Sequence, residues 1–117
     1  MTLKKALIST LIVSALTLAL WSPNRMQAGS PAFQAVKSVF NSKCAVCHGT
    51  DGTANTAKGK ELKVKDMHSA EVQGLSDDKL LEVIAKGKGK MLGYEKSLGK
   101  DKCQELVAYT RELGKKK

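Results

Sequence analysis

The sequence predicts a small all-α domain. Three stretches carry apolar residues at helical spacing, and none shows the sustained apolar–polar alternation of a strand. We expect the first helix to run from Pro31 to about Asn41, because proline suits a helix's first turn and the apolar residues that follow share one face. These apolar residues are Phe33, Val36, Val39 and Phe40.

The second main helix is expected to begin after Ser76, a favourable N-cap residue. Asp77 and Asp78 would complement the helix dipole in its first turn, and Gly87 would end it. Its buried stripe is predicted to consist of Leu80, Leu81 and Ile84.

The last helix is predicted from about Lys100 to Leu113. Its inward residues are expected to be Leu106, Tyr109, Thr110 and Leu113. A shorter turn, residues 70–73, precedes the second helix and has Ser69 as its cap. The stretch from Gly49 to Gly59 is expected to be a loop, since glycine and small polar residues dominate it.

Residues 1–28 are predicted to be a secretory signal peptide outside the fold. Lys4 and Lys5 precede an apolar run of 16 residues, Ala6 to Trp21. This run is shorter than the roughly 20 residues of a membrane-spanning helix. Cleavage after Ala28 would leave one domain of residues 29–117, exported to the periplasm and without stable membrane insertion. An uncleaved N-terminal anchor is the alternative.

The run Cys44-Ala45-Val46-Cys47-His48 matches the attachment pattern of c-type haem, Cys-x-x-Cys-His. Each thiol can add across one vinyl group, and the histidine that follows can reach the iron. A thioredoxin-like thiol pair and a zinc site share the Cys-x-x-Cys core. The thiol pair needs a central sheet that this sequence does not predict. A zinc site would need a fourth ligand from Cys103 or His68, without a second paired motif.

We therefore predict one covalently bound haem c, held by Cys44 and Cys47 and ligated by His48. The predicted domain has only four aromatic residues, so a large apolar cofactor would supply the core that its side chains lack. The third cysteine, Cys103, is left without a partner and is predicted to be buried in the last helix.

Three residues compete for the sixth position on the iron. Met91 is the leading candidate, because it lies between glycines on a loop that joins two helices. Met67 and His68 are the alternatives, since both lie far enough past His48 for the chain to wrap the haem edge.

The chain resembles the class I c-type monohaem cytochromes over its whole predicted domain. The resemblance rests on Phe40 before the motif, Gly49-Thr50-Asp51-Gly52 after it, Met91, and Val107-Ala108-Tyr109-Thr110-Arg111 in the closing helix. It implies the small cytochrome c fold, with about three main helices and a short turn wrapped around one haem. It also implies that the first and last helices cross, with Phe40 near Tyr109.

Two features depart from that family. Leu92 stands where a proline commonly follows the axial methionine, and no proline occurs beyond Pro31. In many members a proline carbonyl orients the proximal histidine. Here a backbone carbonyl from residues 55–62 would have to orient His48.

Haem iron with His48 and Met91 as axial ligands has no open position for a substrate, which predicts a periplasmic one-electron carrier and not an enzyme. The predicted domain has 17 Lys and Arg against 11 Asp and Glu, a net charge of +6, which favours transient, salt-sensitive docking to acidic redox proteins. Nothing resembles a nucleic-acid reader. The lysines expected near the haem edge are Lys43, Lys86, Lys88 and Lys90. The alternatives are a haem sensor or peroxidase-like protein with a displaceable sixth ligand, and a small haem subunit of a larger oxidoreductase.

Overall fold

The computed structural model describes residues 26–116, so most of the predicted signal peptide lies outside the described residues. The helices are α2 (Pro31–Lys43), α3 (Ala45–His48), α4 (Ala57–Glu61), α5 (Ala70–Gln73), α6 (Asp77–Lys86), α7 (Glu95–Leu98) and α8 (Lys100–Lys115). Two short strands, β1 (Gly87–Lys88) and β2 (Met91–Leu92), pair as an antiparallel hairpin. Within the described range, no helix is both long and apolar enough to span a bilayer.

The three main helices lie where the apolar spacing predicts them, and α6 begins after its predicted cap. The hydroxyl of Ser30 accepts the Phe33 amide at 3.1 Å and caps α2. Ser76 caps α6 in the same way, accepting the Lys79 amide at 3.2 Å. Two ends differ slightly from the prediction, since α2 continues to Lys43 and α8 to Lys115.

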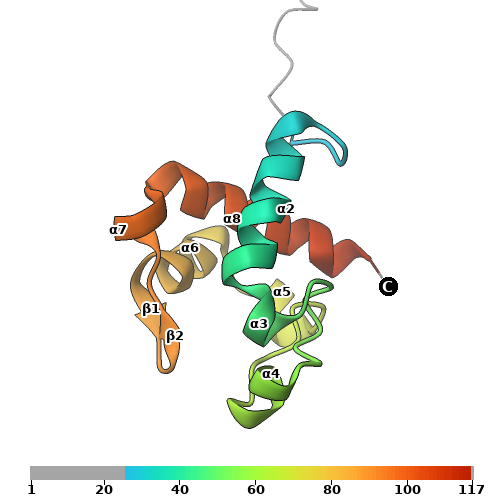
Figure 1. The fold of residues 1–117 in the computed structure, drawn as a ribbon, viewed down its shortest axis with the longest axis vertical. Helices are drawn as coiled ribbons and strands as arrows, with labels where there is room; N and C mark the ends of the chain where they lie inside the picture. The colour runs from blue at the N-terminus through green and yellow to red at the C-terminus, as the bar shows by residue number, and fades with distance from the viewer. Residues whose placement is uncertain (1–25, 117) are drawn as a thin grey trace, which may run out of the picture.

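Helices α2 and α8 cross at the centre of the fold, and α8 passes behind α2 in Figure 1. The ring of Tyr109 packs against Phe40 and Phe33, with ring centroids 5.0 and 5.4 Å apart. Tilted aromatic pairs of this kind each contribute about 0.5–1.5 kcal/mol beyond their burial. Val36 is fully buried beside them. The contact between Phe40 and Tyr109 that the resemblance implied is therefore confirmed.

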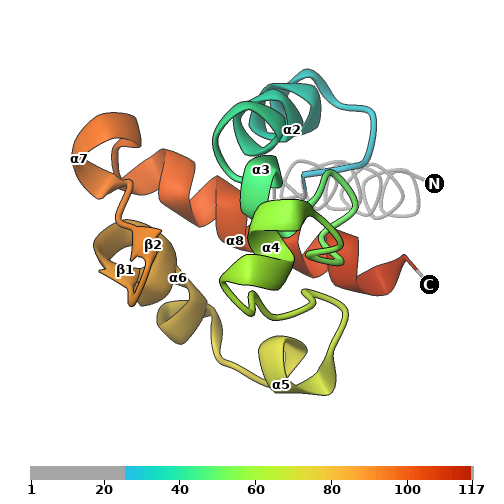
Figure 2. The same ribbon diagram turned by 60° about the horizontal axis from the view of Figure 1, so that its bottom comes forward.

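Helices α6 and α7 also pack against α8 (Figure 2). Leu80 is buried there, whereas Leu81 and Ile84 are only half-buried. Cys103 of α8 is a free thiol with no exposed surface, which confirms its predicted burial. Burial raises the pKa of this thiol, with a smaller contribution from Glu95.

Arg111, on α8, holds the segment between α5 and α6 through hydrogen bonds. Its guanidinium donates to the carbonyls of Gln73 and Leu75 and to the carboxylate of Asp77, at 2.5–2.9 Å. Gln73 itself donates to the Thr110 carbonyl at 3.2 Å. These bonds fix where α6 begins, and so they help to place the hairpin that follows it.

The hairpin and the short helices α3, α4 and α7 are the elements that the sequence did not predict. The hairpin turns at Gly89 and Lys90, with Lys88 opposite Met91 and Gly87 opposite Leu92. A side chain at Gly93 would overlap the backbone at the end of α6, so only glycine lets the returning strand lie this close.

Candidate haem site

The motif residues lie on one turn of helix. Cys44 ends α2 with its amide bonded to the Phe40 carbonyl at 2.8 Å, and its own carbonyl accepts the His48 amide at 2.9 Å. Cys47 and His48 belong to the four-residue helix α3. Both cysteines are half-buried free thiols. Because residues three and four apart share a helix face, the two thiols and the imidazole are gathered at one place.

The short helix α3 is held in place by hydrogen bonds from the loop that follows it. The Ala54 amide donates to the His48 carbonyl at 2.8 Å. The Thr56 hydroxyl reaches the carbonyls of Val46 and Cys47 at 2.9 and 3.1 Å. Sequence reasoning missed Thr56. Its side chain is a recognisable helix cap, but no local pattern shows that it also contacts α3.

The imidazole of His48 is half-buried, and burial lowers its pKa below the ordinary value. The ring is therefore neutral at physiological pH, the form that binds a metal. Its Nδ1 atom is buried and has no hydrogen-bond partner among residues 26–116. The carbonyl expected from residues 55–62 is thus not found on this nitrogen.

The reason lies in α4, where a loop was expected. The carbonyls of this segment bond to amides of the same segment: Thr56 to Lys60, Lys58 to Leu62, and Gly59 to Val64. Within a helix the carbonyls point along the axis toward later amides. These three carbonyl groups are therefore bonded within the segment, and none of them bonds to His48.

Burial raises the pKa of the Cys44 thiol to about 11. The positive charge of Lys43 opposes this rise, and Cys47 adds to it. The free thiol of Cys44 is consequently protonated at neutral pH, a state in which cysteine is a poor nucleophile.

Met91 lies on the hairpin, and the hairpin segment is linked to the chain just before the motif by one hydrogen bond. Met91 is half-buried on β2, opposite Lys88. Three residues later, the Tyr94 hydroxyl donates to the carbonyl of Lys43 at 3.2 Å. Burial raises the pKa of Tyr94, and the nearby Cys44 and Cys47 thiols add to the rise. Tyr94 therefore connects the Met91 segment to the residue directly before the motif.

The two alternative ligands have other surroundings. Met67 is buried in the core cluster that includes Tyr109 and Leu113, and its amide donates to the Gly52 carbonyl at 2.9 Å. The Nδ1 atom of His68 lies 2.7 Å from the carboxylate of Asp66. His68 also lines a groove beside α2 and α8 to which no motif residue contributes.

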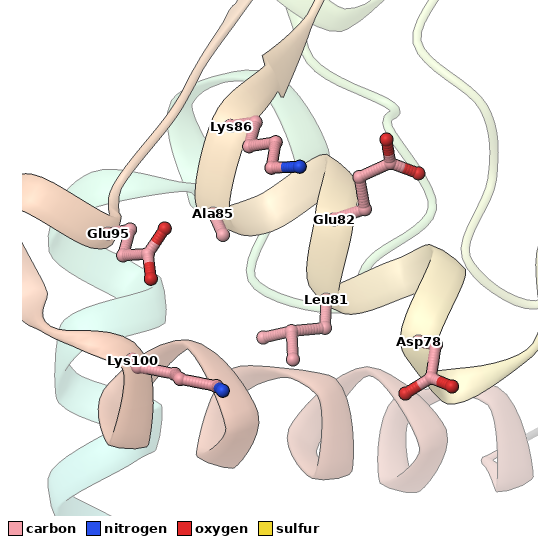
Figure 3. A pocket seen from close by; sticks show the side chains of 7 residues that line it. All are labelled: Asp78, Leu81, Glu82, Ala85, Lys86, Glu95 and Lys100. Atoms are coloured by element: carbon pink, nitrogen blue, oxygen red, sulfur yellow. The ribbon is translucent and has the colours of Figure 1, made fainter.

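A second shallow groove lies where α6 faces α7 and the start of α8 (Figure 3). Leu81 forms part of its floor, and the charged side chains of Glu95 and Lys100 stand on one side of it. It too contains no residue of the motif. Neither groove is therefore the candidate haem site.

An all-α fold with a Cys-x-x-Cys-His helix beside the crossing of its first and last helices defines a c-type cytochrome domain. The family model described as cytochrome c oxidase, cbb3-type, subunit III matches residues 31–109, and the chain belongs to this family of c-type cytochrome domains. The match extends from the start of α2 to Tyr109 and includes both the motif and the hairpin.

A solved structure agrees with this assignment. The KustC0563 c-type cytochrome is similar over 66% of this chain and 94% of its own, with a TM-score of 0.61 and 28% sequence identity. Comparison with the curated proteins gives no match. The family implies a covalently bound haem c and a role in electron transfer.

The residues present fit such a haem. The two half-buried cysteines are free and could each form a thioether bond, and the neutral imidazole of His48 is the next residue in the chain. A metal-bound histidine commonly donates its other nitrogen to a fixed acceptor or water, and within residues 26–116 the buried Nδ1 of His48 has no such acceptor.

Proposed function

We propose that this protein is an exported one-electron carrier with a single haem, attached at Cys44 and Cys47 and ligated by His48 and Met91. One observation carries the proposal: the segment that contains Met91 is bonded, through the Tyr94 hydroxyl, to the carbonyl of Lys43, the residue directly before the motif. Signal cleavage after Ala28 would release a periplasmic domain of residues 29–117.

Met91 is favoured over Met67 and His68 by what surrounds each residue. Met67 fills the core next to Leu113, a role that an apolar side chain serves without any metal. His68 is engaged with Asp66 and lines a separate groove. Met91 is half-buried on a hairpin that is linked to the motif, and its thioether has no comparable role in the core cluster.

The haem would supply an iron that changes oxidation state by one electron. The two thioether bonds would keep it on α3, and the neutral His48 would hold one axial position. With Met91 on the other, no coordination site is left open to a substrate, and we expect no catalytic activity. Methionine ligation would also raise the reduction potential relative to two histidines.

Replacing Met91 with Ala tests the ligand assignment. We expect Met91→Ala to remove the weak long-wavelength band of methionine-bound ferric haem and to let cyanide bind at once. Met67→Leu conserves volume in the core and should keep the band. Absorption spectra of the oxidised proteins measure both. Loss of the band in Met67→Leu, with the band retained in Met91→Ala, would make the assignment wrong.

The surface around the motif and the hairpin fits an acidic redox partner. Lys43, Lys86, Lys88 and Lys90 are all exposed there. Two large apolar side chains on the same segments, Val46 and Leu92, are 69% and 72% exposed. Exposed apolar side chains and charged side chains both occur in transient protein interfaces, where the charges mainly increase the association rate.

Salt dependence tests the role of these charges. Ferricyanide, an anionic oxidant, should oxidise the reduced protein more slowly as salt is added, and a cationic cobalt(III) complex should show the opposite trend. Lys88→Glu should lower the ferricyanide rate several-fold at low salt. The matched reversal Lys37→Glu, on α2, should lower it less. Stopped-flow absorbance measures these rates, and equal effects of the two reversals would remove the steering role.

A small haem subunit of a larger oxidoreductase is the second candidate, and the description of the matching family as an oxidase subunit favours it. Gel filtration of the protein from its native cells separates the two functions. A carrier elutes at the mass of its single domain, whereas a subunit co-elutes with larger chains.

A further inference from the structure

The carbonyl groups at the end of α3 need hydrogen-bond donors from outside the helix, and Thr56 supplies one. A helix leaves its last carbonyls without partners inside the helix, and α3 has only four residues. The next residue, Gly49, has a positive φ of 74° and turns the chain away. The carbonyls of Val46 and Cys47 both face the Thr56 hydroxyl, at 2.9 and 3.1 Å.

The same hydroxyl caps α4. Its oxygen accepts the Gly59 amide at 2.9 Å, while its single proton is shared between the two carbonyls of α3. One side chain therefore joins the end of the motif helix to the start of the next helix. A side chain at Gly59 would overlap the Cys47 carbonyl, so the close approach of α4 to the motif depends on this glycine.

We propose that Thr56 is a positioning residue for the proximal ligand: its hydroxyl fixes the end of α3, and through it the direction of His48. The inference rests on the proposed haem attachment and His48 ligation. Val46 and Cys47 lie next to His48 in the chain. Without the hydroxyl, their carbonyls either lose a partner or recruit water.

Both consequences favour the ferric state. The carbonyl end of a helix is negative, and a donor on it reduces that charge. Removal of the donor leaves more negative charge near the iron, and entering water stabilises the higher charge of Fe(III). The reduction potential should therefore fall when the hydroxyl is lost.

Four variants separate this role from ordinary helix capping. Thr56→Val removes both the hydrogen-bond donor and the helix cap, whereas Thr56→Ser keeps both. Thr56→Gly removes the donor but keeps most of the capping, because glycine at an N-cap position costs only a few tenths of a kcal/mol. Ser76→Ala is the matched control, since Ser76 caps α6 through the Lys79 amide. No hydrogen bond within residues 26–116 has the Ser76 hydroxyl as donor to another element.

The measurements are the reduction potential, by redox titration of the holoprotein, and the urea midpoint of unfolding. We expect Thr56→Val and Thr56→Gly to lower the potential and Thr56→Ser to match the wild type. Ser76→Ala should lower the urea midpoint without moving the potential. Thr56→Gly keeps the test decisive if Thr56→Val does not fold.

Two results would overturn the positioning role: an unchanged potential in Thr56→Gly, or an equal fall in Ser76→Ala. Either could occur while Met91→Ala still loses its methionine band, so the proposed carrier function would stand. A wild-type protein with no covalent haem would overturn both proposals together.

Discussion

The two sides of the candidate haem site are built very differently. On the motif side, every backbone carbonyl from Cys44 to His48 accepts a hydrogen bond, from an amide or from the Thr56 hydroxyl. On the methionine side, Met91 lies on a strand of two residues, and its neighbour Leu92 is largely exposed.

The difference shows how a very short element can be held in place. Helix α3 has four residues and no stability of its own, but bonds from a loop up to ten residues away fix both its end and its direction. The hairpin has few such bonds, and segments with little buried surface open at low free energy. If the two residues ligate the iron as proposed, we expect His48 to be the permanent ligand and Met91 the exchangeable one. The alternative function, a haem sensor with a displaceable sixth ligand, therefore depends on how firmly the hairpin holds Met91.

Gly59→Ala should have the largest effect, because it breaks the packing on the motif side. In an open helix, alanine would stabilise by up to about 1 kcal/mol relative to glycine. At Gly59 the new methyl group would instead overlap the carbonyl oxygens of Ala54 and Cys47, which are backbone atoms that cannot turn aside. We expect a loss of roughly 2–3 kcal/mol in the free energy of unfolding, measured by urea denaturation.

Gly89→Ala, at the turn of the hairpin, is the matched change on the methionine side. No atom lies within 4 Å of the position of its Cβ, so only the positive φ of 58° opposes the substitution. That strain costs about 1 kcal/mol. If Gly89→Ala destabilises the protein as much as Gly59→Ala, the two sides are equally constrained and the contrast between them is wrong.

The main helices could be predicted from the sequence because their signals are local. The apolar spacing of α2 and α8 identifies their buried faces, and Ser30 and Ser76 are caps that bond within their own first turn. The motif identifies three site residues in the same way, since five consecutive positions contain the whole chemistry.

The remaining features depend on contacts across the chain. Helix α4 has five residues, too few for a periodic signal, and its glycine and lysines resemble a loop. The contact of Tyr94 with Lys43 spans 51 residues, and no pattern near either residue indicates it. The fold was therefore largely predictable, whereas the bonds that fix the motif helix and the hairpin were not.

Tyr94→Phe should have a smaller effect, and it tests the side-chain bond that, within residues 26–116, links the two sides. The variant keeps the ring and loses only the hydroxyl that donates to the Lys43 carbonyl. A neutral hydrogen bond of this kind contributes about 0.5–1.5 kcal/mol. We expect a loss of stability in that range and faster cyanide binding to the ferric protein, because the Met91 segment is held less firmly. Stopped-flow absorbance measures the binding rate.

The pH dependence of the stability difference between the wild type and Tyr94→Phe shows whether the Tyr94 hydroxyl causes that difference. Burial raises the pKa of Tyr94, so the folded state favours the protonated phenol over the phenolate. Its contribution is complete below the unfolded pKa of about 10 and is lost as the pH rises through the higher folded value. The stability difference between the wild type and Tyr94→Phe should therefore be constant near neutral pH and shrink above about pH 10. A difference that persists at high pH would mean that the ring, and not its hydroxyl, holds the Met91 segment to the motif.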